Sequence, residues 1–447
     1  MIIRIENTNS RIVEEKVYRY RRKRRDRVIR RRLAQKRDSS FIYPDRLKIV
    51  SSLLLKELEK RGYISAQYKT KKLVVPECFS LKKDFDDSIL FYKQLLSTFF
   101  YKEGDLKVDF SKCKEMSNAN YVLFDLFVKE LLAVQARYNK NIYRKSNKNV
   151  LVSNPSKVDD KTNKYLITGG YVDLKDVDNV NVKDSFLPLH PIKGKNKNYQ
   201  ESLKGIAARY VSKFVRNTLD RVDYQEFAND KNAIEGFITE ILSNAEEHSV
   251  SNSEWYISGI SFHEDQHNVN VVELNLSIIN VGVTMYEGFE ATKEPNHSNY
   301  SVVEQLYEMH RRQFTLFKRF ERESLFMLYM LNDDISRLKY EGEGRGNGTM
   351  HFINKFIYLG RYGIQNTDFN PILNVISGHT VLTCDGKYQP SDEVTNKMIL
   401  SLNKEKTLEK LPDSDYLCAH NEFFPGTILE CKIYLNKDYF MTKETDS

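Results

Sequence analysis

Cysteine is scarce in this chain of 447 residues, and no two cysteines form a close pair. Structural zinc sites need ligands at short spacing, and disulfide frameworks need an even number of cysteines. The sequence therefore indicates neither kind of cross-link, and we expect buried free thiols. The five cysteines are Cys78, Cys113, Cys384, Cys418 and Cys431.

Long apolar runs are also missing. No stretch approaches the roughly twenty apolar residues of a membrane helix, and residues 1–15 lack the hydrophobic region of a signal peptide. We therefore expect a cytoplasmic protein with no transmembrane segment. Hydrophobic residues make up 40% of the chain and charged residues 29%, which is typical of globular proteins, and the length allows two or three domains.

Two common catalytic motifs are absent as well. The sequence contains no G-x-x-x-x-G-K and no G-x-S-x-G, so P-loop nucleotide hydrolases and serine esterases are disfavoured. HEDQH at 263–267 has the H-E-x-x-H spacing of zinc peptidases of the zincin type. That motif requires a helix, whereas these residues read as the polar connection of a hairpin between two strands, so the zincin class is disfavoured as well.

Positive charge is concentrated near the beginning of the chain. Residues 16–37 contain thirteen Lys or Arg and one acid, Asp26, so the rest of the chain is slightly acidic although the whole carries +8. Such a segment attracts nucleic acid or an anionic membrane through its charge, but its two tyrosines offer little base stacking. An acidic surface of this protein or of a partner is an equally good counterpart. We expect residues 1–70 to be a basic, largely helical segment.

Residues 234–249 carry the main functional signal. Glu240, Asn244 and His248 follow one another at four-residue steps, so on a helix they share one stripe beside a second, apolar stripe. A carboxylate can activate a water molecule, an amide oxygen can bind a hard divalent cation, and an imidazole can reach a phosphate. Amphipathic core helices with a polar edge show the same pattern, so the helix alone does not establish a site.

A glycine-rich run, GEGRGNG, follows about a hundred residues later, at 342–348. It leads into TMHFINKFIYLG, where apolar residues keep helical spacing and Gly360 marks a plausible end. Glycines that open a helix leave backbone amides free at its positive end, which is a good position for phosphate.

Together, these motifs resemble those of the GHKL superfamily of ATP-binding domains, over residues of about 205 to 437. The family's N box, E-x-x-x-N-A-x-x-H or K, is matched at Glu240, Asn244, Ala245 and His248. The resemblance implies Glu240 as general base and Asn244 as the Mg²⁺ ligand, with ATP as the nucleotide. The family's second glycine box would hold the phosphates beneath a mobile lid and corresponds to Gly344, Arg345, Gly346, Asn347 and Gly348.

The adenine side of the resemblance contains one departure. The family has D-x-G-x-G after a central strand, and here that stretch is N-V-G-V-T. Asn280 stands in the aspartate position, and Gly282 matches the first glycine of the pattern. The Asn280 amide can still accept a hydrogen bond from an adenine amino group, but it can also turn to favour a keto group. A late G-T resembles Gly426 and Thr427, and the family uses this threonine near the adenine.

The expected fold of residues 201–447 is α+β, a two-layer helix and sheet sandwich of the Bergerat type. Strands are predicted at 255–262 and 270–279, joined as a hairpin, and a terminal strand at 428–435 would close the sheet. Residues of about 285–341 read as an inserted helical lid. Its arginines and lysines can face either the triphosphate or solvent.

Residues 71–200 read as a small α/β domain followed by a linker. Strand, helix, strand and helix alternate within 72–135, which predicts parallel strands. The segment 106–131 resembles STAS-like domains, the anti-sigma-factor-antagonist type. Some members of that family are phosphorylated at a serine in the turn where Ser117 stands. The alternative is an unmodified turn in which Ser117 or Asn118 caps the helix.

Three functions are consistent with these observations. The first is a signalling or regulatory switch that binds Mg-ATP and hydrolyses it. The second is a serine or histidine protein kinase of a partner-switching pathway, since some relatives in the GHKL family phosphorylate STAS partners. The third is a non-catalytic nucleic-acid or protein-binding scaffold with a degenerate ATP site. The partners expected are nucleotide, a protein partner or a second copy of the chain, and nucleic acid at residues 16–37.

Overall fold

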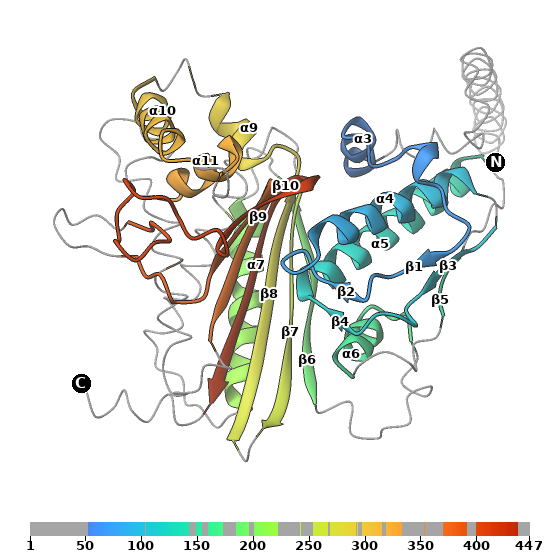
Figure 1. Cartoon of the computed structure of the whole chain (residues 1–447). Helices are drawn as coiled ribbons and strands as arrows, with labels where there is room; N and C mark the ends of the chain where they lie inside the picture. The colour runs from blue at the N-terminus through green and yellow to red at the C-terminus, as the bar shows by residue number, and fades with distance from the viewer. Residues whose placement is uncertain are drawn as a thin grey trace, which may run out of the picture.

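The computed structural model of the chain has two halves placed side by side (Figure 1). The described residues begin at 52, so the basic segment lies outside them. They are 52–102, 104–142, 149–153, 160–172, 185–195, 201–221, 242, 254–266, 269–291, 293, 297–314, 319–332, 353, 370–390 and 399–436.

The N-terminal half is built from short parallel strands and helices. Strands β1, β3 and β5 form one parallel sheet in the order β1-β3-β5, and β2 pairs with β4 in a second. The predicted alternation of strands and helices is confirmed. Its elements are α3 (Leu53–Lys60), η1 (Ala66–Tyr68), β1 (Leu73–Val74), β2 (Cys78–Phe79), α4 (Phe85–Tyr101), β3 (Leu106–Asp109), β4 (Glu115–Met116), α5 (Asn118–Ile142), β5 (Val150–Ser153) and α6 (Asp160–Thr168).

One predicted strand of this half is divided. The sequence KLVVPECFSL reads as a single strand, but it forms β1 and β2 on either side of Pro76. Proline has no backbone N–H to donate to a neighbouring strand, so continuous pairing stops there.

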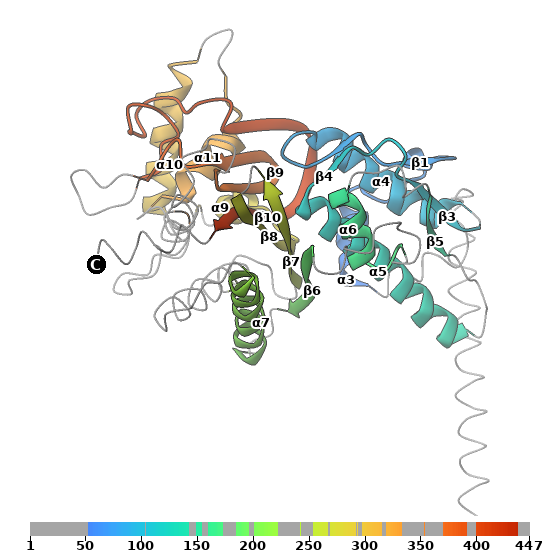
Figure 2. The same ribbon diagram turned by 90° about the horizontal axis from the view of Figure 1, so that it is seen from below.

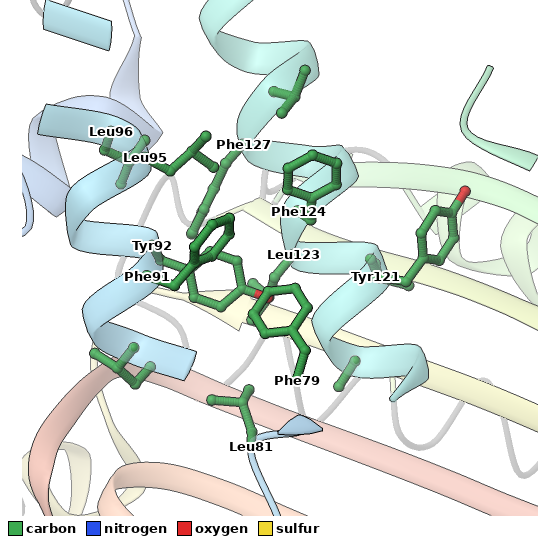
Figure 3. Packing of buried hydrophobic residues seen from close by; sticks show 14 of the residues in the cluster. Phe79, Leu81, Phe91, Tyr92, Leu95, Leu96, Tyr121, Leu123, Phe124 and Phe127 are labelled. Atoms are coloured by element: carbon green, nitrogen blue, oxygen red, sulfur yellow. The ribbon is translucent and has the colours of Figure 1, made fainter. Parts of the chain in front are cut away.

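Helices α4 and α5 form the interior of the N-terminal half. Aromatic side chains interlock between them, with Phe91 and Tyr92 from α4 facing Phe124 and Phe127 from α5 (Figure 3). Most of α4 is buried around its whole circumference, which fits its near-continuous apolar sequence. Buried aromatic pairs of this kind add a preferred geometry to the apolar burial, so they fix how the two helices cross.

The C-terminal half is organised on a five-stranded sheet in the order β6-β7-β8-β10-β9. Every neighbouring pair is antiparallel, and β7 and β8 form the predicted hairpin with Gln266 opposite Val269. Strand β6 falls in the stretch that the sequence indicated as a linker, and it forms one edge of this sheet. The strands are β6 (Phe186–Lys195), β7 (Glu254–Gln266), β8 (Val269–Val281), β9 (Ile372–Cys384) and β10 (Leu417–Asn436).

Helices cover one face of the sheet. Helix α7 lies along it, and three helices stand at one end, between β8 and β9 in sequence (Figure 1). These helices are α7 (Glu201–Asp220), α9 (Met285–Glu290), α10 (His297–Arg311) and α11 (Arg322–Met330). Their apolar side chains and those of the facing strands form what we call the helix-side cluster, which includes Val211, Leu276, Phe326, Val375 and Cys431.

The N-terminal half covers the opposite face of the same sheet, as the view from below shows (Figure 2). Tyr256, Ile279 and Ile428 on this face belong to one continuous apolar cluster with the interior of the N-terminal half. The two halves therefore share a core. Among the helices that the structure describes, none combines the length and apolarity needed to cross a membrane.

Polar side chains of β8 and β10 are buried in this shared core. Asn118 donates from Nδ2 to Ser277 Oγ at 2.7 Å, and the backbone N–H of Ala119 donates to Glu430 Oε1 at 2.9 Å. Lys161 pairs with Glu273 at 2.8 Å. Burial alone would raise the pKa of Glu273, but the charge of Lys161 helps to hold it below its ordinary value. Polar residues that alternate along β8 thus bind the N-terminal half instead of water.

Candidate functional site

Three of the predicted site residues fall within the described parts of the chain. Asn280 lies at the end of β8, Gly282 follows it in the loop, and Thr427 lies on β10. The remaining predicted residues lie outside the described residues, so their roles stay predictions. They are Glu240, Asn244, His248, Gly344, Arg345, Gly346, Asn347 and Gly348.

Asn280 and Thr427 lie directly opposite each other on neighbouring strands. Strand alternation puts the Asn280 side chain on the same face as Leu276 and Ile278, which belong to the helix-side cluster. Thr427 shares that face with Cys431 for the same reason. Side chains of directly opposed residues have Cβ atoms about 5 Å apart, so these two side chains are direct neighbours. The structure thus brings together two residues that are 147 positions apart in the sequence.

The backbone beside this pair leaves no room for a side chain at position 426. Gly426 has a φ of +135°, and a Cβ atom there would lie 2.0 Å from the carbonyl oxygen of Asn280. Only glycine tolerates both conditions. The glycine of the G-T pair therefore allows β10 to approach β8 closely at Asn280.

A third residue, Ser377 on β9, completes the cluster and was not identified from the sequence. Its hydroxyl is buried, with the residue 1% exposed, and donates to the carbonyl oxygen of Gly426 at 2.8 Å. It also lies 3.1 Å from Thr427 Oγ1 and accepts from the backbone N–H of Met285 at 2.9 Å. No local motif marks Ser377, because only the placement of β9 beside β10 brings it to this position.

The loop after Asn280 leads directly into α9. The N–H of Gly282 donates to the Pro425 carbonyl at 3.1 Å, and Thr284 is the N-cap of the helix. Thr284 and Glu287 bind each other's backbone N–H groups, as in a capping box. The threonine that replaces the last glycine of the family pattern thus has a local structural role, and its T-x-x-E spacing is a signal that could have been recognised.

Arg61, which directly follows α3, holds this loop from the N-terminal half. Its guanidinium forms a two-point ion pair with the Glu287 carboxylate, with one N–O distance of 2.9 Å, and approaches the Gly282 carbonyl at 3.4 Å. Burial would raise the pKa of Glu287, but hydrogen bonds from Arg61 and Thr284 outweigh it and hold the pKa below its ordinary value. The start of α9 is therefore fixed by both halves of the molecule.

The predicted catalytic helix is represented by a single described residue, Leu242. It is helical, fully buried and part of the helix-side cluster, as expected for a member of the apolar stripe of 234–249. Ile353, from the apolar sequence after the glycine run, is also helical, fully buried and in the same cluster. Leu242 and Ile353 therefore pack on the face of the sheet that carries Asn280 and Thr427.

The segment predicted as a lid contains α9, α10 and α11. Helix α11 is buried from Ser324 to Tyr329 and packs on β9, so it belongs to the core of this half. Arg322 is one of the basic residues of this segment that, by sequence, can face either the triphosphate or solvent. Its guanidinium binds both carboxylate oxygens of Glu304 and lies 4.2 Å from the centre of the Phe326 ring. The arginine thus has a structural role between α10 and α11.

Ser117 lies in the turn that leads into α5. Ser117 Oγ accepts from the Asn120 N–H at 3.4 Å and donates to Asn120 Oδ1 at 3.1 Å, so Ser117 caps α5. The backbone amide of Ala119 faces the sheet and donates to Glu430. Glu430 is 7% exposed, and its carboxylate occupies the positive end of α5. This geometry fits the capping alternative.

The described parts of the chain show neither a metal-binding cluster nor a reactive thiol. Among those residues, no group of three or more His, Cys, Asp or Glu side chains is arranged to hold a metal ion. Cys113, Cys384 and Cys431 are buried, and burial raises the pKa of the Cys384 thiol to about 12, which makes a thiolate unfavourable. No protein-family model, curated protein or solved structure matches the chain.

Proposed function

We propose that the chain is a GHKL-type ATP-binding regulatory protein, with the base of the nucleotide at Asn280 and Thr427. The observation that carries this proposal is the direct pairing of these two residues on β8 and β10. The motif order of the family requires its base-binding aspartate position and its late threonine to meet in space. Nothing in the local sequence of either strand requires it.

The triphosphate and its metal belong to the segments of the N box and the glycine run. Leu242 lies between Glu240 and Asn244 in sequence, and it packs in the helix-side cluster together with Ile353. This supports a common location for the two motifs on the face that carries Asn280. There, Asn244 would supply an oxygen ligand to Mg²⁺, which neutralises phosphate charge, and Glu240 would orient the attacking water. Gly344 to Gly348 would offer backbone amides to the phosphates.

The output of the site is a change in contacts around α9. The loop from Gly282 to Thr284 connects the base-binding strand to this helix, and Arg61 attaches the same loop to the N-terminal half. Nucleotide at Asn280 would therefore bias both the helical segment and the α3 contact. A partner protein or a second copy of the chain would receive this change, and hydrolysis would reset it.

A kinase acting on its own N-terminal half is the less favoured alternative. Ser117 is engaged as a helix cap, and Glu430 already occupies the anion position at the start of α5. Phosphate at Ser117 would add negative charge beside that carboxylate. These contacts do not bear on transfer of phosphate to a separate protein. Labelled γ-phosphate appearing on a partner protein would favour the kinase function.

Calorimetry of the full chain with ATP and Mg²⁺ tests the proposal. We expect binding with ATP and weaker binding with GTP. Glu240→Ala should retain ATP affinity and lose turnover, whereas Glu246→Ala, which on a helix lies outside the stripe of Glu240, Asn244 and His248, should retain both. Unchanged turnover in Glu240→Ala would eliminate Glu240 as the base. Undetectable nucleotide affinity, combined with salt-sensitive binding of nucleic acid, would favour the scaffold function instead.

A further inference from the structure

The hydroxyl of Ser377 is surrounded by three polar groups, of which a carbonyl oxygen and a backbone N–H have fixed roles. A serine hydroxyl has one proton to donate and two lone pairs to accept with. The Gly426 carbonyl can only accept, so the Ser377 proton points to it across 2.8 Å. The Met285 N–H can only donate, so it occupies one lone pair at 2.9 Å. One lone pair of Ser377 remains, and it faces Thr427 Oγ1 at 3.1 Å.

Thr427 must therefore donate its own proton to Ser377. If Ser377 donated to Thr427 instead, the oxygens of Ser377 and Gly426 would face each other at 2.8 Å without a proton between them, in a buried place where repulsion is strong. With its only proton used, Thr427 can offer nothing but lone pairs to a ligand. The residue is half-buried, and its side chain lies on the face that it shares with Asn280.

We propose that Ser377 is a specificity-determining residue, which fixes Thr427 as a hydrogen-bond acceptor and thereby selects bases that present an amino group over bases that present a keto oxygen. This inference rests on the proposed nucleotide site. The amide of Asn280 can turn to suit either base, so it discriminates poorly by itself. Ser377 has no contact with the base in this arrangement and acts through Thr427.

The sharpest test compares ATP with inosine triphosphate, whose base carries a keto oxygen in place of the amino group. Calorimetry on the full chain with Mg²⁺ should give a preference for ATP of about tenfold or more, because a keto oxygen facing a fixed acceptor loses a hydrogen bond. In Ser377→Ala the Thr427 hydroxyl is free to rotate and donate. Its preference should fall to about threefold or less, mainly through tighter binding of inosine triphosphate.

Two further variants separate this role from a general effect on the fold. Thr427→Val removes the hydroxyl and should also reduce the preference, and adding Ser377→Ala to it should change the ratio no further. Ser258→Ala is the matched control, since Ser258 is a buried serine on β7 that donates to the Leu189 carbonyl at 2.8 Å. This control should keep the full preference.

The outcomes distinguish the inference from the function on which it depends. Binding of ATP with the same preference in Ser377→Ala, or in Thr427→Val, overturns the role of Ser377 and leaves the nucleotide site intact. Absence of binding of either nucleotide to the unaltered chain overturns the proposed function itself.

Discussion

Neighbouring residues of β8 face two different interiors of the molecule. Leu276 is packed in the helix-side cluster, while the next residue, Ser277, is buried against the N-terminal half and bound to Asn118. The apolar interior tolerates many side chains of similar volume, because apolar contacts have little directionality. The polar interior requires each donor to meet its acceptor, since an unpaired buried group is costly. Apolar contacts on both faces therefore supply most of the stability, and the polar contacts of the second face determine how the halves fit together.

The largest effect is expected at Leu276, which is compared with Ser277 on the other side of the same strand. Leu276→Ala should lower the free energy of unfolding by about 2–5 kcal/mol, because it leaves a cavity in the helix-side cluster. Ser277→Ala should cost about 1–2 kcal/mol, because Asn118 loses its acceptor. Denaturant unfolding of both variants measures the difference. Equal losses would contradict the distinction between the two interiors.

The comparison also shows what the sequence could and could not predict. Alternation along 270–279 correctly predicted β8 and its hairpin with β7, because alternation is a local property of a strand. It did not predict that both faces are buried, since polar residues at every second position normally face water. Glu430 and Asn118 are separated by more than 300 residues, and no local pattern relates the carboxylate of one strand to the start of a distant helix.

A smaller effect is expected at Glu430, which binds the N-terminal half most directly. Its carboxylate accepts from Ala119 N–H and from Asn374 Nδ2 at 3.2 Å, so Glu430→Ala leaves two buried donors without an acceptor. We expect a loss of about 2–3 kcal/mol in the free energy of unfolding. Glu405→Ala, at an exposed glutamate, should change it by only a few tenths. A neutral result at Glu430 would mean that the polar interior does not hold the halves together.

The smallest effect is expected at the Arg61–Glu287 pair, whose side chains are 19% and 34% exposed. Arg61→Ala should lower the free energy of unfolding by about 1 kcal/mol at neutral pH. The pKa of Glu287 is lower in the folded protein than in the unfolded chain. The ion pair therefore stabilises the fold at pH values above the unfolded-chain pKa of about 4.3, and this stabilisation is lost as the pH falls through the folded-state pKa. Thermal unfolding at pH 7 and in acid should show the cost disappearing in acid.

A matched exposed pair provides the control for that experiment. Lys83 and Glu115 form an ion pair whose side chains are 59% and 49% exposed, and Lys83→Ala should have almost no effect at either pH. Equal effects of Arg61→Ala and Lys83→Ala would reduce the Arg61 contact to an ordinary surface pair.

The candidate site divides in the same way between local and non-local information. Asn280, Gly282 and Thr427 could be selected from motifs, because each motif is a short run of sequence. Ser377 and Arg61 could not be selected, because they reach the site only through the order of strands in the sheet and the docking of the N-terminal half. The proposed preference of the site for one base also depends on the direction of a single hydroxyl proton, which no motif specifies.

Hydrogen exchange of the full chain, with and without saturating Mg-ATP, tests the central claim most directly. The account predicts that nucleotide slows exchange in peptides that contain residues 280–285 and 426–428. Exchange in β3 and β5, at the far side of the N-terminal half, should be unchanged. Slower exchange confined to the N-terminal half, or no change anywhere at saturating nucleotide, would contradict a nucleotide site at Asn280 and Thr427.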